Sequence, residues 1–366
     1  MSGPLYVAAG GGGDAIMAAV LSRVFYPDQR PTIATFAWDR LMYDPLPGPR
    51  TVADFDGLRR LTPLNFAVEQ RTRPRPPAGS TLPRLAGDID AILVLLDPRG
   101  GADGLRKQLA ELVDYGSHQQ VEIVDVGGDA IAEGHEPTLS SPLADALALA
   151  ATVGQRVAVH VHVAGPGSDG ELNQATMRAR LRTTNAVLVH RLSEQDAQLV
   201  ARTLSWHPSE ATTMTLAAAC GVRGTVEIRT DGTVIDLTED SANVYRATLA
   251  DVIGTSVSAE AVMDSTSLEV AEAQLRIAIG FTELDFEHSK AAARAHRVAT
   301  DGLDPALAKK RIRAYSADAR TRGIDYLTFR RLAEVAELTA AEADAMRRTL
   351  LADESNRWQF GLWTTT

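Results

Sequence analysis

The stretch LYVAAGGGGDAIMAAVLSRVF, residues 5–25, decides the fold. Its first five residues are apolar and typical of a buried strand. Four glycines follow, and then Ile16, Val20 and Val24 recur at the spacing of a helix. A turn of this kind lets the backbone approach a ligand closely, and the helix after it offers unpaired N–H groups to an anion.

Four more apolar runs alternate with segments of helical periodicity in the first half of the chain. The runs cover residues 32–38, 91–96, 121–126 and 156–163, and the helical segments cover 14–25, 105–115, 142–152, 171–182 and 194–204. Ser141 and Ser193 stand where N-caps are expected. The pattern predicts an α/β fold, with a Rossmann-like, mostly parallel sheet that carries helices on both faces.

The rest of the chain departs from this alternation in two places. Residues 40–87 hold eight of the 17 prolines and little periodicity, which predicts a long insertion without regular structure. Beyond residue 208, Asp231-Gly232 separates two short apolar runs and predicts a hairpin, and the chain from about residue 242 has a mainly helical pattern. We therefore expect a Rossmann-like domain over 1–208, with its proline-rich insertion, and a hairpin plus helical C-terminal region over 209–366.

Composition excludes several classes of protein. The 366 residues carry 37 Lys and Arg against 47 Asp and Glu, a net charge of −10, which disfavours binding to nucleic acid. One cysteine, Cys220, excludes an intramolecular disulfide and a cysteine-rich metal site. The sequence has no 18-residue apolar run free of charge and no basic start typical of a signal peptide, so we expect a cytoplasmic protein without membrane segments.

The turn after the first strand is the first candidate ligand site. Its residues fit the pattern G-x-G-x-x-A, and Asp39 lies after the second strand, about where an acid would bind ribose in a dinucleotide fold. The turn predicts binding of a nucleotide or phosphate; another small anion, such as an amino-acid carboxylate, and a tight turn without a ligand remain alternatives. The candidate ligand-binding residues here are Gly10, Gly11, Gly12, Gly13, Asp14, Trp38, Asp39 and Arg40.

Acidic residues next to glycine follow four strands at the same predicted edge of the sheet. Because ligands of open parallel sheets bind beyond the carboxyl ends of the strands, we expect these acids to converge on one cleft. The proposed catalytic residues are Asp129, Glu136, Asp169, Glu171 and His135, with Gly127, Gly128, Ser168 and Arg50 as further ligand-binding residues.

Converging carboxylates repel one another and need compensation. A divalent metal, Mg²⁺ or Mn²⁺, would provide it, with Asp129, Asp169 and Glu171 as its ligands. A cationic group of the substrate would also provide it, and so would the arginines Arg40, Arg50, Arg99 and Arg229. The sequence leaves these alternatives open.

Several familiar catalytic motifs are absent. The sequence has no H-E-x-x-H, no G-x-S-x-G and no G-x-x-x-x-G-K-[ST], which disfavours a standard metalloprotease, an α/β-hydrolase and a P-loop enzyme. His160 and His162 alternate with valines on one strand and lack the cysteines of a zinc deaminase. Cys220 lies among small residues and is more typical of a core position than of a nucleophile.

The motifs, taken in order, resemble the domain-of-unknown-function family 1152. They are AGGGGD (9–14), WDR (38–40), DPLPGPR (44–50), VDVGGD (124–129), GHE (134–136), SPLADA (141–146) and GSDGEL (167–172). The resemblance is strong over residues 4–172 and looser over the helical remainder. It implies a Rossmann-like enzyme whose activity is unassigned, and so it names no reaction.

We therefore expect a transferase or hydrolase that binds a small anionic, nucleotide-like or phosphorylated metabolite, with residues 40–50 closing over it. An NAD(P)-dependent oxidoreductase is the first alternative, with Asp39 binding the ribose. A non-catalytic small-molecule sensor, whose helical C-terminal region docks a partner, is the second. The cofactor stays unknown, with Mg²⁺ or a nucleotide as candidates, and a homo-oligomer stays open.

Overall fold

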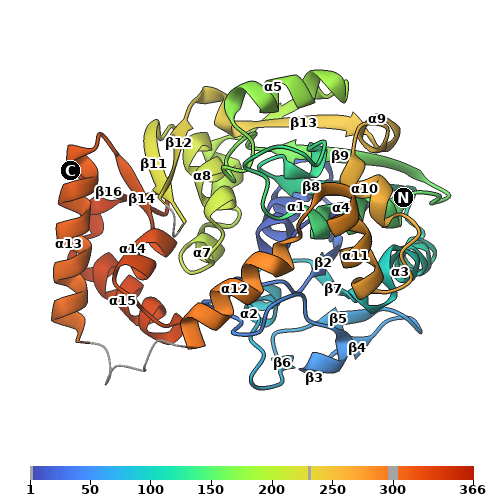
Figure 1. The fold of residues 1–366 in the computed structure, drawn as a ribbon, viewed down its shortest axis with the longest axis horizontal. Helices are drawn as coiled ribbons and strands as arrows, with labels where there is room; N and C mark the ends of the chain where they lie inside the picture. The colour runs from blue at the N-terminus through green and yellow to red at the C-terminus, as the bar shows by residue number, and fades with distance from the viewer. Residues whose placement is uncertain (1–2, 230–231, 296–303) are drawn as a thin grey trace.

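A nine-stranded sheet forms the centre of the computed structural model, which describes residues 3–229, 232–295 and 304–366 (Figure 1). Its order is β10-β13-β9-β8-β1-β2-β7-β5-β4. The five middle strands are parallel and confirm the five predicted apolar runs. They are β1 (Leu5–Ala8), β2 (Thr32–Phe36), β7 (Ile92–Leu96), β8 (Gln120–Val126) and β9 (Ala158–Ala164).

The order of these five strands makes the fold doubly wound. From β1 the chain moves outward to β2 and β7, and it then returns to the other side of β1 to form β8 and β9. The strand order therefore reverses between β1 and β8. A crevice opens at such a point in Rossmann-like sheets, beyond the carboxyl ends of the strands. The predicted Rossmann-like fold is confirmed.

Helices cover both faces of the sheet. On one face lie α1 (Gly12–Phe25), α2 (Leu82–Asp88) and α8 (Glu210–Ala219). On the other face lie α3 (Gly101–Gly116), α4 (Pro142–Thr152), α10 (Val257–Val262) and α11 (Leu268–Ile279). Because both faces are covered, β1 is apolar throughout: Leu5 and Val7 pack in one core, Tyr6 and Ala8 in the other.

Two predicted helices differ from the pattern at their ends. The segment 171–182 becomes α5 (Gln174–Thr183), because the Asn173 side chain accepts the N–H groups of Ala175 and Thr176 and so begins the helix. The segment 194–204 divides into α6 (Glu194–Gln198) and α7 (Ala201–Leu204). Ser193 caps the first of them, as expected.

The prediction that residues 40–87 lack regular structure is wrong. The segment adds β5 (Phe66–Val68) and β4 (Arg59–Arg60) to the edge of the large sheet, where β5 pairs antiparallel with β7. It also forms η1 (Val52–Asp54) and a small sheet of β3 (Phe55–Asp56) and β6 (Arg73–Pro74). Strands of two or three residues are too short to produce a recognisable period. Pairing stabilises them: β5 pairs with β7, β4 with β5, and β3 with β6.

The C-terminal region contains a second sheet that the helical pattern does not reveal. Its order is β12-β11-β14-β16-β15, with α13 (Pro305–Thr321), α14 (Phe329–Val335) and α15 (Ala340–Asp353) beside it at the left of Figure 1. The predicted hairpin is present, although Asp231 lies outside the described residues. The strands are β11 (Gly224–Ile228), β12 (Thr233–Leu237), β14 (Tyr326–Thr328), β15 (Trp358–Gln359) and β16 (Leu362–Thr364).

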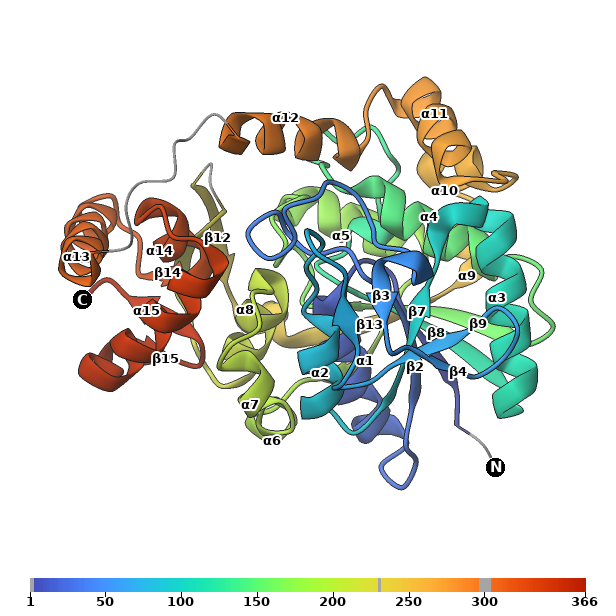
Figure 2. The ribbon, with the colours of Figure 1, turned by 90° about the horizontal axis from the view of Figure 1, so that it is seen from below.

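After β12 of the second sheet, the chain returns to the large sheet for one strand before it forms β14. β13 (Asn243–Thr248) pairs antiparallel with β9, and β10 (Val187–Arg191) with β13; α9 (Leu249–Ile253) follows. α12 (Glu283–Ala295) then runs from the neighbourhood of α11 toward the C-terminal helices, as both views show (Figures 1 and 2). The division at residue 208 stays a prediction. No helix within the described ranges is long and apolar enough to cross a bilayer.

Candidate active site

A cleft of about 160 Å³ opens where the strand order reverses. The turn after β1, the end of β2, the segment after β8 and the segment after β9 all reach it, as the positions of the predicted motifs require. Helices α4, α8 and α12 complete its walls. Of the predicted residues, the lining contains Gly10, Gly11, Gly12, Gly13, Asp14, Trp38, Asp39, Arg40, Asp129, Asp169 and Glu171.

The glycine turn is fastened by Asp14. One oxygen of its carboxylate accepts the Gly10 N–H at 2.7 Å, and the other accepts the Val126 N–H at 3.0 Å, which ties the turn to the end of β8. Burial still raises the pKa of Asp14 to about 7, because it outweighs these two bonds. Asp14 is thus a structural part of the turn, and it leaves the N–H groups of Gly11, Gly12 and Gly13 without acceptors in the described chain.

His207 stands directly across from this turn, a position that the sequence did not predict. Its Nδ1 accepts the Ser209 N–H at 3.2 Å, so Nε2 carries the proton of the neutral ring. Nε2 is buried, has no hydrogen-bond partner among residues 3–229, 232–295 and 304–366, and lies 2.9 Å from the point where a Cβ on Gly12 would stand. Burial, assisted by the charges of Arg347 and Arg84, lowers the pKa of His207 to about 3, so the ring is a neutral donor at pH 7.

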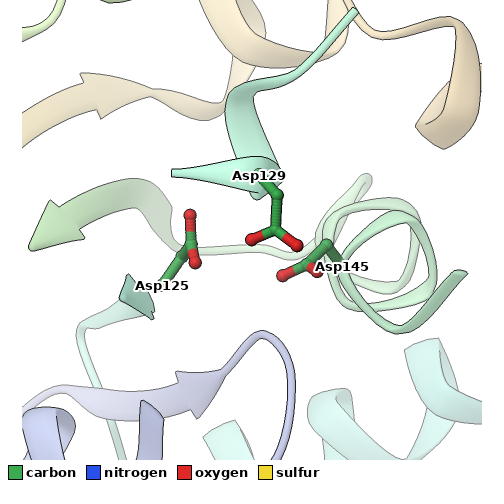
Figure 3. A group of neighbouring side chains, drawn as sticks. All are labelled: Asp125, Asp129 and Asp145. Atoms are coloured by element: carbon green, nitrogen blue, oxygen red, sulfur yellow. The ribbon is translucent and has the colours of Figure 1, made fainter. Parts of the chain in front are cut away.

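Three aspartates form the acidic floor of the cleft. Asp125 ends β8, Asp129 begins η3 (Asp129–Ile131), and Asp145 lies in the first turn of α4. Each offers one carboxylate oxygen, and these three atoms lie within 4.8 Å of one another. Figure 3 shows the three side chains turned toward a common centre. Burial, together with repulsion from neighbouring carboxylates, raises the pKa of each well above its usual range.

Asp169 and Glu171 border this floor but differ in their partners. Glu171 accepts the N–H groups of Ser140 and Ser141 and forms an ion pair of 3.1 Å with Arg229. Burial opposes its ionisation, but Arg229 and these bonds hold its pKa below the usual range. One oxygen of Asp169 accepts the Glu171 N–H at 2.8 Å, and the other, Oδ2, is buried with no partner in the described ranges. Burial and the Glu171 charge raise the pKa of Asp169 to about 7.

Three predicted ligand-binding residues act on the shape of the site and do not line it. Gly127 and Gly128 have φ angles of +123° and +109°, and a Cβ on Gly127 would lie 2.1 Å from Asp169 Oδ2. Glycine is required there because only a bare backbone leaves room for that carboxylate. Ser168 is buried and accepts a hydrogen bond from Thr215 Oγ1 at 3.0 Å.

The WDR motif contributes one free cation and two fixed groups. Trp38 donates its Nε1 hydrogen to Glu287 of α12 at 3.0 Å, and Asp39 accepts from both the N–H and the hydroxyl of Thr81. Burial outweighs these bonds and raises the pKa of Asp39. The Arg40 side chain is exposed at the cleft and has no ion-pair partner in the part of the chain that is described.

Arg50 does not reach the cleft. It is buried, forms an ion pair with Asp44 at 2.8 Å, and donates to the carbonyls of Pro47 and Gly48. It therefore holds the proline-rich loop together. Arg99 likewise lies away from the cleft, beside Asp97.

Glu136 and His135 also fall outside the lining, so the expectation that Glu136 converges with the other acids is wrong. The Glu136 carboxylate accepts the N–H groups of Glu133 and Gly134 within its own turn, at 2.7 and 2.9 Å. His135 is exposed to solvent. Glu136 therefore stabilises its own turn instead of reaching the cleft.

Helix α12 supplies two acids that no local motif marks. Glu283 accepts the N–H groups of Leu143 and Ala144 at 2.6 and 3.1 Å, so it caps α4 in place of the Ser141 side chain, which instead donates to Glu171. Burial raises the pKa of Glu283 to about 8. Glu287 accepts from Trp38 and from the Gly48 N–H at 2.7 Å. Contacts between residues so far apart in sequence leave no local signal.

Comparison with known proteins adds a family. A family model described as "Protein of unknown function (DUF1152)" matches residues 5–291. The chain belongs to this family. The match confirms the resemblance and extends it past residue 172, so the DUF1152 region of this chain includes β13 and the acids of α12. Neither the curated proteins nor the solved structures gave a match.

Proposed function

We propose that this DUF1152 protein is an enzyme that binds a small phosphate-bearing, nucleotide-like metabolite at the glycine turn and catalyses group transfer or hydrolysis on it. One observation carries the proposal: in the described part of the chain, the N–H groups of Gly11–Gly13 at the N-terminus of α1 have no acceptor, and the buried Nε2–H of His207, also without a partner there, lies beside Gly12 in the same cleft. Convergent donors at the positive end of a 14-residue helix are suited to an anion.

The cation at the entrance supports the same assignment. Arg40 lines the cleft with no acid paired to it among the described residues, and a guanidinium binds phosphate oxygens in a bidentate manner. Arg229 is already committed to Glu171, so we assign it to positioning that carboxylate.

The chemistry is assigned to the acids beside the anion site. Asp169 has a buried oxygen without a donor at the edge of the cleft, and we assign it the removal of a proton from the attacking nucleophile. Asp129, half-buried on the floor, faces the same space. No observation favours the oxidoreductase, because the two Asp39 oxygens that would bind a ribose already accept from Thr81.

The anion site is tested with Gly12→Ala. The new Cβ would lie 2.9 Å from His207 Nε2 and 3.3 Å from Thr81 Oγ1, so it fills the space for the anion. Inorganic phosphate, pyrophosphate, AMP and ATP are titrated without metal against the wild type by calorimetry and by thermal shift. We expect binding of at least one of them, weakened tenfold or more in Gly12→Ala.

Gly104→Ala is the matched control, because Gly104 is also helical and a Cβ there meets nothing within 4 Å. It should bind as the wild type does. Turnover is followed as release of phosphate or pyrophosphate from any compound that binds, and Asp169→Asn should abolish it with little change in melting temperature. The proposal fails if none of the anions binds, or if Gly12→Ala binds them unchanged.

A further inference from the structure

The buried carboxylates of the cleft fall into two groups by their hydrogen-bond donors. Asp14, Glu171 and Glu283 each accept at least two backbone N–H groups, so the protein itself compensates their charge. The three aspartates of the floor accept fewer hydrogen bonds. Asp125 accepts one N–H, that of Ala130 at 3.2 Å, and Asp129 accepts only a 3.4 Å contact from the Ser141 hydroxyl.

Asp145 is the extreme case. It is 5% exposed, and its buried Oδ1 has no hydrogen-bond partner among the residues that the structure describes. Within the described ranges, no lysine, arginine or histidine forms an ion pair with Asp125, Asp129 or Asp145. The neighbouring Asp169 Oδ2 is likewise buried and unpartnered, although it lies outside the group of three. An uncompensated buried carboxylate is costly, so four of them at one place require a cation or bound protons.

The geometry fits a single ion. Oxygens that bind one divalent ion at roughly 2.0–2.6 Å lie at most about 5 Å apart. The three oxygens of the floor are within 4.8 Å of one another, and their side chains point to a common centre (Figure 3). They come from the end of β8, from η3 and from α4, which are held by the sheet and by the Glu283 cap, so the arrangement is fixed before an ion arrives.

From these observations we infer that Asp125, Asp129 and Asp145 bind one divalent metal ion, Mg²⁺ or Mn²⁺. Oxygen ligands suit Mg²⁺, Mn²⁺ and Ca²⁺, but Ca²⁺ takes six to eight of them, whereas three protein ligands leave room for the waters that Mg²⁺ retains. A substrate ammonium group fits less well, because one positive charge faces three carboxylates. Of the metal ligands predicted from sequence, only Asp129 belongs to this set: Glu171 is paired with Arg229, and Asp169 borders the set.

The ion would link the anion site at the glycine turn to the acidic floor of the cleft. Asp129 opens to the cleft, so a metal held there can take an oxygen of the bound phosphate as a further ligand and withdraw charge from it. This role rests on the function proposed above. The existence of the metal site does not, since the aspartates and their missing donors are independent of the glycine turn.

The test uses Mn²⁺ alone, with the full chain and no phosphate compound. After removal of metal with a chelator, Mn²⁺ is titrated and the free ion is followed by electron paramagnetic resonance. We expect one Mn²⁺ per chain at submillimolar concentration, displaced by Mg²⁺. Asp145→Asn should weaken binding at least tenfold. Its metal-free form should melt no lower than the wild type, because the substitution relieves repulsion.

Asp28→Asn is the matched control, since Asp28 is exposed in the turn after α1 and far along the chain from the three aspartates. It should bind Mn²⁺ as the wild type does. Should Asp145→Asn fail to fold, Asp129→Asn replaces it, at a residue that is only half-buried. The inference is overturned if the wild type binds no Mn²⁺ at 1 mM, if an amine but no metal stabilises it, or if the folded variant binds equally well. Mn²⁺ binding without anion binding would overturn the proposed function alone.

Discussion

The neutral state of His207 leads to a prediction about stability in acid. Burial lowers the pKa of His207 to about 3 in the folded protein, whereas histidine in an unfolded chain titrates near about 6.5. Between these values the unfolded chain binds a proton that the folded chain does not. The contribution of His207 to the free energy of unfolding is therefore intact above pH 6.5 and is lost progressively as the pH falls toward 3.

The size of this loss follows from the two pKa values. At pH 5 the unfolded imidazole is protonated in a ratio of roughly 30 to 1, while the folded one remains neutral, which lowers the free energy of unfolding by about 2 kcal/mol relative to pH 7. Other groups of the cleft also titrate in this range. A comparison with His207→Gln, whose side chain does not titrate, removes their contribution.

The measurement is urea unfolding of the wild type and of His207→Gln at pH 7, 6 and 5, in buffer without phosphate. The free energy of unfolding of the wild type minus that of the variant should fall by about 2 kcal/mol from pH 7 to pH 5. A difference that is the same at all three pH values would refute the neutral, buried state of His207.

Two further predictions concern residues that shape the site. Gly127→Ala should destabilise the protein more than Gly221→Ala. Both glycines have positive φ, so alanine costs about 1–2 kcal/mol at either position. At Gly127 the new Cβ also meets Asp169, which adds about 1–3 kcal/mol. Equal urea midpoints for the two would contradict the crowding. Arg50→Ala should lower the free energy of unfolding by about 3–5 kcal/mol, because the buried Asp44 carboxylate loses its cation and keeps the N–H groups of Leu46 and Gly79 as donors. An exposed pair would cost less than about 1 kcal/mol in the same assay.

The parallel core of the fold could be predicted because its strands are fully apolar and long enough to be recognised. The same reasoning does not find β4 and β5, or the sheet that contains β14, β15 and β16. Those strands have two or three residues, and their stability comes from pairing with neighbours that are distant in the sequence.

The residues of the site also divide into those that the sequence could place in the cleft and those that it could not. Residues that lie within five positions of a strand end, such as Asp129 and Asp169, could be placed in the cleft because the sheet fixes where the chain leaves the strand. Direction within a loop is not fixed, and so Glu136 turned out to bond to its own backbone. Asp145 lies in the SPLADA motif, but on a helix, where sequence alone does not show which way the side chain points. His207 comes from a loop far along the chain, and its local sequence does not indicate the cleft.

The two carboxylates of α12 have a consequence for the order in which the chain matures. Glu283 and Glu287 are four residues apart, about 6 Å along the helix. Glu283 accepts a hydrogen bond from the start of α4, and Glu287 accepts from Trp38 and Gly48. The cleft therefore acquires the wall that α12 provides only after the ribosome has synthesised residue 287, long after the strands that build its base have emerged. A nascent or truncated chain that ends before Glu283 would contain all three aspartates of the floor, but its cleft would lack the wall that α12 provides.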